Sequence, residues 1–393
     1  MNFSQQMRQI AMKLSWRLKR LFMKYSWQLR LAAPRFFPVC ADWFYVKYDK
    51  NSAVTNGTVF CACGLGEDQH QGFAEISHCP TGVDLVWASL MERKWYTGDF
   101  EFSEEEMALI DSLFRNGFVG YDYNFIKNPK PQQLTYEMFS VCCLPGGAVR
   151  FYMIGRCKTI CLDIVFHAEE THEMDDVIIH GPSVNRHPDI NFYDSVSDYF
   201  DDNLYEGKHA KTLEELKEEE NDMYEAIAYH RANGVPYGLW NRYFRRYNYK
   251  INVVFEDKET KLYHEDCKFA NGERFMLYTA INPSNTIDRP SPVKELYIQW
   301  ISKEYYYDAR FYFNEEETLN RFENLLSESG NYTLEIRISK YNNYFEIVLK
   351  DDKDLYTFES VEIVAFRSVG YYGTNEKVYS NCDYDHQNSF IGS

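Results

Sequence analysis

The same order of hydrophobic and polar positions occurs in two distant parts of the chain. Phe-Glu-Phe-Ser-Glu-Glu-Glu at residues 100–106 recurs as Phe-Tyr-Phe-Asn-Glu-Glu-Glu at residues 311–317. An aromatic run typical of a β-strand precedes each copy, and apolar residues at helical spacing follow it, over residues 107–114 and 319–326. The copies lie too far apart for a solenoid, whose period is roughly 20 to 50 residues. The pattern therefore predicts two related modules.

Each predicted helix has recognisable start and stop signals. Ser103 precedes the first helix and Glu106 follows three residues later. This spacing predicts a capping box, in which each side chain accepts a hydrogen bond from the other residue's backbone amide. The same spacing recurs before the second helix, and a glycine follows each helix, as is usual at helix C-termini. These further signals are Asn314 with Glu317, and Gly117 and Gly330.

Strands joined by tight turns follow each predicted helix. The first turn is Pro145-Gly146-Gly147, where glycine supplies positive φ without steric cost, and the second is Tyr341-Asn342-Asn343. Each module is therefore predicted to be an antiparallel sheet with one helix on one face, which makes the predicted fold class α+β. The strands predicted around the turns are residues 138–144, 148–154 and 159–166, and residues 332–339, 344–350 and 358–366.

The pattern divides the chain into five predicted parts. Two tandem related α+β modules are joined by a helical acidic linker, with a basic extension before them and a tail after them. A one-signed acidic run is either a solvated linker or a docking surface, and both interpretations remain open. The parts are a basic amphipathic helical extension (1–24), the first α+β module (25–168), the acidic helical linker (169–247), the second α+β module (248–368) and the tail (369–393).

The charge of the chain restricts its partners. Across 393 residues the net charge is −17, which argues against nucleic acid as a partner, because proteins bind phosphates with Lys and Arg. The first 50 residues are nevertheless basic. Residues 7–25 place apolar side chains at helical spacing between Lys and Arg. Such a helix either packs on its own domain or makes peripheral contact with a membrane surface.

The first residues give no export signal, because basic residues interrupt every apolar window of the required length. No apolar run approaches the roughly 20 residues that a membrane-spanning helix needs. We therefore expect a cytoplasmic protein as the sequence is written. The alternative is a periplasmic or envelope protein whose start site is misassigned.

The cysteine pattern favours free thiols. The chain has 10 cysteines but no Cys-x-x-Cys pair, so a zinc site is not expected. Cys61 and Cys63, and Cys142 and Cys143, lie in strand-like runs. We expect no disulfides, and we expect strand alternation to divide these four side chains between core and surface.

Residues that resemble catalytic or metal-binding groups have simpler explanations. His167 and His172 bracket Glu169-Glu170, but their spacing of five differs from the i, i+4 zincin pattern, and a solvated loop explains them better. The Glu-Glu-Glu segments stand in first helical turns, where acids oppose the helix dipole. No nucleophile elbow or phosphate loop is present. We expect no enzyme activity, no cofactor and no metal.

Several segments together resemble a bacterial family of unknown function, DUF2931. The resemblance implies relatives that are mostly small envelope lipoproteins without known catalysis, some of which resemble immunity proteins encoded beside type VI secretion lipase effectors. This chain lacks the lipid-modified cysteine near the start. The segments cover most of the chain; they are Ala-Ala-Pro-Arg-Phe-Phe-Pro-Val (32–39), Leu-Val-Trp-Ala-Ser-Leu-Met-Glu-Arg-Lys-Trp-Tyr (85–96), Leu-Pro-Gly-Gly-Ala-Val (144–149), Gly-Val-Pro-Tyr-Gly-Leu-Trp (234–240) and Arg-Tyr-Asn-Tyr (246–249).

The resemblance and the charge together predict a non-enzymatic binding protein, most concretely an immunity protein that occludes a bacterial toxin such as a type VI lipase-like effector. Acidic immunity proteins suit targets with basic active-site rims, because complementary charge speeds encounter. The alternative is a ligand- or glycan-binding, or structural, envelope protein. The residues expected to face or border the partner are Glu214, Glu218, Glu219 and Trp240.

Overall fold

The structure is a computed structural model. It describes residues 25–37, 39–49, 52–55, 59–61, 64–67, 76–89, 91–92, 94–121, 130–171, 233–278, 287–325, 331–351, 353–369, 375–382 and 390. The predicted basic extension and most of the predicted acidic linker, including Glu214, Glu218 and Glu219, lie outside these residues.

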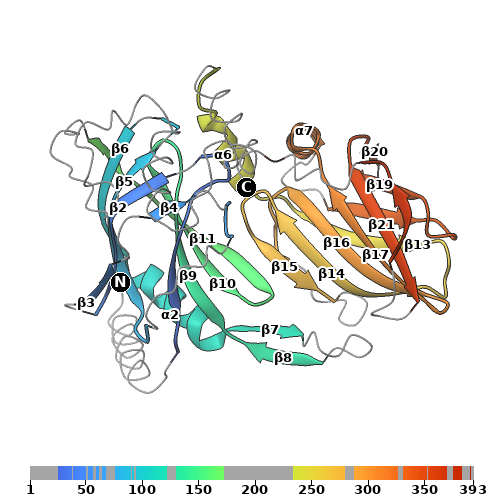
Figure 1. The fold of residues 1–393 in the computed structure, drawn as a ribbon, viewed down its shortest axis with the longest axis horizontal. Helices are drawn as coiled ribbons and strands as arrows, with labels where there is room; N and C mark the ends of the chain where they lie inside the picture. The colour runs from blue at the N-terminus through green and yellow to red at the C-terminus, as the bar shows by residue number, and fades with distance from the viewer. Residues whose placement is uncertain are drawn as a thin grey trace, which may run out of the picture.

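The predicted α+β class is wrong, because the fold is mostly β (Figure 1). Within the described residues the helices are only α2 (Glu104–Asn116), α6 (Tyr237–Phe244) and α7 (Glu315–Leu325), beside 22 strands. The physical reason is that each half of the chain contains two sheets. A second sheet, rather than a helix, therefore buries most of the apolar strand face.

The first half forms two large sheets and one short hairpin. One has the order β12-β6-β5-β2-β3, with β4 also on β2, and the other begins β1-β9-β10-β11, where β1 is parallel to β9. Helix α2 connects β6 to the short β7–β8 hairpin. The strands are β1 (Gln28–Ala32), β2 (Val39–Tyr48), β3 (Ser52–Thr55), β4 (Val59–Cys61), β5 (Pro80–Ser89), β6 (Lys94–Glu101), β7 (Phe118–Tyr121), β8 (Pro131–Leu134), β9 (Tyr136–Cys143), β10 (Ala148–Gly155), β11 (Lys158–His167) and β12 (Glu169–Thr171).

The second half repeats this connectivity. The order β21-β17-β16-β14-β15 matches the first sheet, and β13-β18-β19-β20, with β13 parallel to β18, matches the second. Helix α7 follows β17 as α2 follows β6. The strands are β13 (Tyr249–Phe255), β14 (Lys261–Phe269), β15 (Arg274–Leu277), β16 (Val293–Ser302), β17 (Tyr305–Tyr312), β18 (Tyr332–Ile338), β19 (Phe345–Lys350), β20 (Leu355–Thr357), β21 (Glu362–Val369) and β22 (Glu376–Ser380).

The two halves meet edge to edge, and we call this junction the seam. Strand β11 of the first half pairs with β15 of the second, through Lys158 opposite Phe275 and Thr159 opposite Arg274. This pairing joins one sheet from each half into a ten-stranded sheet that crosses the molecule (Figure 1). Only two residue pairs make the connection, so side chains around the seam must supply much of its stability.

The helix caps follow the sequence prediction in part. Ser103 and Glu106 form the predicted capping box, and Gly117 ends α2 with φ 56°. Asn314 also caps α7, because its side chain accepts from the Glu317 amide at 3.0 Å. The Glu317 carboxylate, however, accepts from the amides of Glu359 and Ser360, both at 2.9 Å, and therefore anchors a distant turn. Gly330 lies outside the described residues.

The prediction that alternation divides the cysteines is wrong for Cys142 and Cys143, which are both fully buried. The reason is that β9 lies inside its sheet with packed side chains on both faces. The side chains of Cys61 and Cys63 lie outside the description. The cysteines whose side chains are described are free thiols: Cys79, Cys142, Cys143, Cys157, Cys161, Cys267 and Cys382.

Candidate functional site

The β16–β17 hairpin positions the candidate site. Trp300 and Tyr307 face each other across the hairpin, and their rings stack at 5.4 Å with an interplanar angle of 7°. Both side chains are buried, so this face of the hairpin belongs to the core. Side chains alternate along strands, and the neighbouring residues therefore project from the opposite face. On that face the Gln299–Asp308 and Tyr297–Arg310 pairs lie side by side.

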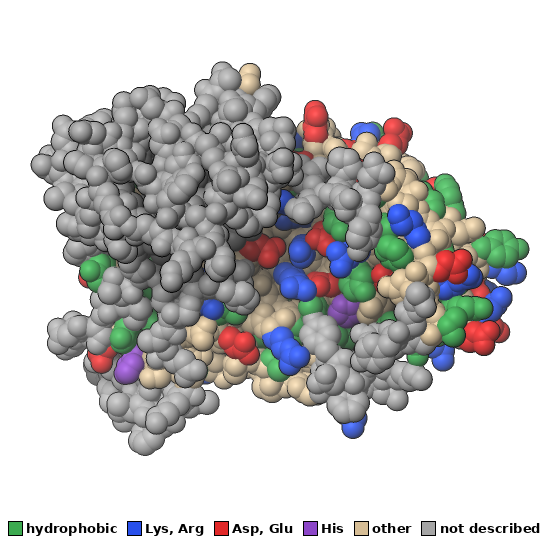
Figure 2. All heavy atoms as spheres, viewed as in Figure 1, with side chains coloured by type: hydrophobic (Ala, Val, Ile, Leu, Met, Phe, Trp, Pro, Cys, Tyr) green, Lys and Arg blue, Asp and Glu red, His purple; other side chains and the backbone are tan. Residues whose placement is uncertain are grey.

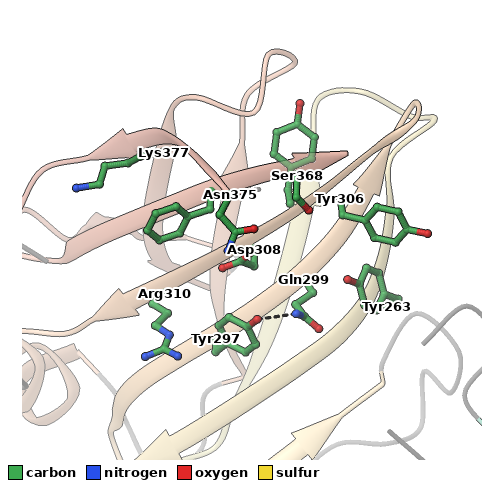
Figure 3. Close-up of a pocket in the computed structure, with 11 residues that line it drawn as sticks. Tyr263, Tyr297, Gln299, Tyr306, Asp308, Arg310, Ser368, Asn375 and Lys377 are labelled. Atoms are coloured by element: carbon green, nitrogen blue, oxygen red, sulfur yellow. Dashed lines mark hydrogen bonds between the residues drawn. The ribbon is translucent and has the colours of Figure 1, made fainter. Parts of the chain in front are cut away.

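An open groove of about 730 Å³ runs over this outer face. Figure 3 shows its side chains projecting from neighbouring strands of the ten-stranded sheet. We call it the tyrosine groove, because tyrosine is its most frequent residue. It is lined by Tyr263, Tyr297, Gln299, Tyr306, Asp308, Arg310, Phe366, Ser368, Asn375 and Lys377. Tyr307 also belongs to the lining, although its ring stacks on Trp300.

Contacts on several sides hold Tyr297 in the groove. The Gln299 side-chain amide donates to its hydroxyl at 2.5 Å, and the Arg310 guanidinium lies 5.4 Å from its ring centroid. The His264 ring meets it edge-on with centroids 5.8 Å apart. A ring restrained in this way loses little conformational entropy when a ligand or partner packs against it.

The electrostatics of the groove combine one carboxyl group with two cations. Burial raises the pKa of Asp308 above its usual value, and the nearby positive charge of Arg310 opposes this rise. Burial also lowers the pKa of His264 to about 4, so the imidazole is neutral at physiological pH. Arg310 and Lys377 are exposed at the rim. The groove therefore offers hydrogen-bonding groups beside aromatic surfaces.

The structure buries the one predicted partner-facing residue that it describes. Trp240 is 5% exposed and packs edge-on against Phe37, with ring centroids 5.0 Å apart. Tyr237, on the same helix α6, is 47% exposed and is the more accessible aromatic residue. Trp240 does not belong to the lining of the tyrosine groove. The partner-facing role of the predicted set stays a prediction.

Other residues that the sequence singled out have structural partners. Arg246 binds the Glu273 carboxylate through two nitrogens at 2.9 and 3.0 Å, in keeping with a packing role. His167 ends β11, and His172 lies outside the described residues. Within the described residues, no group of three or more His, Cys, Asp or Glu side chains could hold a metal ion, and no helix is long and apolar enough to cross a membrane.

Sequence reasoning did not find the tyrosine groove. A usable signal was present, because residues 305–312 place Tyr306, Asp308 and Arg310 at alternate positions, on the face opposite the buried aromatic residues. The pattern alone does not say whether such a face is open or covered. That depends on β14 and β21, which are distant in sequence and flank the hairpin.

Comparison with known proteins gives one match. The family model described as "Protein of unknown function (DUF2931)" matches residues 6–238, which is more than half of the chain. No curated protein and no solved structure matches. The family match ends before β13, so the tyrosine groove lies outside the matched residues.

Proposed function

The chain belongs to the DUF2931 family of unknown function, and we propose that it is a non-enzymatic binding protein whose binding surface is the tyrosine groove. The observation that supports this most directly is the concentration of tyrosines, a carboxyl group and an arginine on one open sheet face. Binding sites typically join aromatic surfaces to a few well-placed polar groups. Restrained rings such as Tyr297 add preorganisation.

The proposed partner is a protein, most concretely a bacterial toxin such as a type VI lipase-like effector that this chain occludes. Tyr and Arg are enriched among the residues that dominate protein interfaces. The net charge of −17 favours a basic partner, because complementary charge speeds association. Glu214, Glu218, Glu219 and Trp240 remain proposed contributors to this electrostatic attraction or to the border of the interface.

A glycan is the second candidate ligand. Tyr306 and Phe366 offer ring faces, while Gln299 and Asp308 offer hydrogen-bonding groups beside them. The raised pKa of Asp308 fits a carboxyl group that exchanges hydrogen bonds with hydroxyl groups. This alternative corresponds to an envelope ligand-binding protein.

Two further proposals concern origin and location. We infer that the halves arose by internal duplication, which is supported by their equal strand connectivity. For the compartment we propose the cytoplasm, with the envelope as the alternative. Fractionation of the native cell, with residues 7–25 present or deleted, tests the compartment and the proposed membrane contact.

The proposed function is tested by measuring binding to the toxin encoded beside the gene. Tyr306→Ala and Arg310→Ala should each weaken binding by about 2 kcal/mol, or roughly 30-fold, as expected for residues that dominate an interface. Tyr341→Ala is the matched control, because Tyr341 is 78% exposed in the β18–β19 turn and is absent from the groove lining. Its affinity should equal that of the unmodified protein.

The outcomes separate the two candidates. Loss of toxin binding in the groove variants, with loss of protection in co-expression, supports the immunity function. Saturable binding of cell-envelope oligosaccharides that Tyr306→Ala abolishes supports the glycan function. Equal affinities in the groove and control variants for both kinds of ligand would remove the groove from the proposal.

A further inference from the structure

Strand β13 forms one edge of the β13-β18-β19-β20 sheet, and within the described residues it pairs with β18 alone. The equivalent strand of the first half, β1, is enclosed by other backbone at both ends. Just before it, Trp27 and Ile76 exchange hydrogen bonds of 3.0 and 2.9 Å, and just after it the Ala33 carbonyl accepts from the Gly64 amide at 2.9 Å. Almost all of β1 is buried, whereas β13 is not. The two halves therefore differ at this edge.

The ladder with β18 shows which backbone groups of β13 face outward. At one end the Asn248 carbonyl accepts from the Tyr332 amide at 3.3 Å. At the other end the Glu256 amide donates to the Ile338 carbonyl at 3.0 Å. Backbone groups alternate in direction along a strand, so the even-numbered residues point theirs toward β18. The odd-numbered residues point theirs away from β18; they include Ile251, Val253 and Phe255.

The side chains of β13 also leave this edge open. From Lys250 onward the even-numbered side chains are exposed, and Val254 is 38% exposed. The odd-numbered ones pack against the core but stay partly exposed. Phe255 is one of these, and its ring centroid lies 5.9 Å from that of the buried Trp300. Outward N–H and C=O groups beside partly exposed apolar side chains are a ready template for another strand.

We propose that β13 pairs antiparallel with β13 of a second copy of this chain, with Val253 on the two-fold axis. Such a contact is self-complementary, as a two-fold interface must be. In this register the outward-pointing residues lie opposite one another and exchange hydrogen bonds, Ile251 with Phe255 of the second copy and Val253 with its own counterpart. Apolar inner-face side chains then meet apolar side chains.

Charge complementarity favours this register and this occupant. Lys250 lies opposite Glu256 of the second copy, and the pair occurs twice in the dimer. Opposite charges that face each other across an antiparallel pair stabilise it. Both residues are exposed, and the Lys340 amide holds the Glu256 carboxylate at 2.9 Å at the end of the strand. In the register centred on Asn252 instead, Lys250 would face the uncharged Val254.

The overall charge of the chain opposes self-association, because two copies each carry −17. The interface therefore needs local attraction of its own. Figure 2 shows hydrophobic side chains and charges of both signs side by side at the right-hand end of the molecule, where the second half lies. Strand β13 itself contains one lysine and no acidic residue. The strand thus adds no negative charge to the surface that an acidic copy must approach.

Sedimentation equilibrium of the full-length protein tests the pairing and should show a concentration-dependent dimer. Lys250→Glu and Glu256→Lys should each weaken the dimer by about tenfold or more, because each replaces two opposite-charge contacts with two like-charge contacts. The double variant restores opposite charges and should regain the native affinity. Lys130→Glu is the matched control, because it makes the same charge change at an exposed residue of the first half and should leave the affinity unchanged.

Hydrogen exchange at single amides tests the backbone contact directly. The amides of Ile251, Val253 and Phe255 should exchange fast in dilute solution and become protected as the dimer forms. Those of Asn252 and Val254 should be protected throughout, because they point toward β18. Val253→Pro removes an outward N–H and leaves the β18 ladder intact, so it should abolish the dimer. If this variant does not fold, exchange in the native protein still decides.

The outcomes are distinct. A protein that stays monomeric at every concentration overturns the proposal, as does a dimer whose odd-numbered β13 amides stay unprotected. Protection of these amides in the monomer assigns the edge to another segment of this chain, and protection only when the toxin is added assigns it to that partner. Either result removes the second copy. Failure of the double variant to regain affinity overturns the register, and none of these results depends on the tyrosine groove.

Discussion

The two halves have equivalent central hairpins that share an aromatic pair on one face and differ in character on the other. On the inner face, Trp87 stacks on Tyr96 at 5.3 Å in the first half, as Trp300 stacks on Tyr307 at 5.4 Å in the second. On the outer face, the first half pairs Val86 with Thr97 and Asp84 with Asp99. The corresponding pairs in the second half are Gln299–Asp308 and Tyr297–Arg310, which line the tyrosine groove.

This difference shows which constraint acts on each face. The inner face is fixed by packing, so an aromatic stack of similar ring separation serves both halves, with interplanar angles of 28° and 7°. The outer face is not required for the core, and its side chains can change without disturbing the fold. In the first half Lys47 and Asp99 form an ion pair at the surface there. The second half carries restrained aromatic residues, which suit binding.

The largest expected effect tests whether the inner faces are equivalent. Trp87→Ala and Trp300→Ala should each lower the free energy of unfolding by about 3–5 kcal/mol, as removal of a fully buried large aromatic side chain does. Urea unfolding followed by circular dichroism measures this. Tyr341→Ala is the exposed aromatic control and should change stability little. A loss below about 1 kcal/mol in either Trp variant would contradict the equivalence.

The next largest change in stability is expected at the seam. The two halves are not equivalent there, because the first half pairs through β11 and the second half through β15. Gly66→Ala should destabilise the protein by about 1–3 kcal/mol, since the new methyl group would overlap the Gly272 carbonyl. Gly238→Ala is the control, because a Cβ at Gly238 would have no other atom within 4 Å among the described residues. Alanine there should be neutral or slightly stabilising in α6. Equal stability of both variants would show that the seam does not close as tightly as this geometry requires.

Sequence alone predicts the local features of these halves. The Ser103 cap, the Gly146-Gly147 turn and the end of α2 at Gly117 depend on residues a few positions apart, and all are found. The division of each half into two sheets, and the β11–β15 pairing, depend on contacts far apart in sequence. Local signals alone therefore predict that a helix next to a run of strands covers a single sheet.

The candidate site shows the same limit. Strand alternation correctly places Asp308 and Arg310 opposite the buried face of β17, but it does not show that β14, β16 and β21 surround them. Burial of Trp240 likewise depends on Phe37, which comes from a loop about 200 residues earlier in the chain. The predicted acidic residues of the linker lie outside the described residues, so their role stays a prediction.

The two stacked tryptophans differ in their hydrogen bonding, which predicts a smaller difference in stability between their variants. The Trp300 indole N–H donates to the Asn342 side-chain oxygen at 2.8 Å, whereas the Trp87 indole nitrogen has no hydrogen-bond partner among the described residues. Trp300→Phe should therefore cost about 1 kcal/mol more than Trp87→Phe, because it leaves the buried Asn342 oxygen unsatisfied. Urea unfolding of both variants gives the difference. Equal losses would mean that water or a rearranged Asn342 replaces the bond.

The smallest expected change in stability comes from replacing one outer-face residue of the second half with the residue at the equivalent position of the first half. Asp308→Thr places a hydroxyl group where the equivalent residue is Thr97. Burial raises the folded-state pKa of Asp308, so its ionisation opposes folding. The native protein should therefore lose a little stability as the pH rises from the unfolded-state value of about 3.9 through the higher folded-state pKa. The variant should lack this part of the loss.

The measurement is thermal unfolding of both proteins from acid to neutral pH, with Asp99→Thr as the control at an exposed carboxylate. Asp308→Thr should be equal in stability to the native protein at the acid end and slightly more stable near neutrality. It should also bind the groove's ligand more weakly, because the carboxyl group contributes to the groove lining. Gained stability together with lost binding would identify Asp308 as a residue kept for function. A variant that is less stable at neutral pH would instead show that Arg310 stabilises the ionised carboxylate more than burial opposes it.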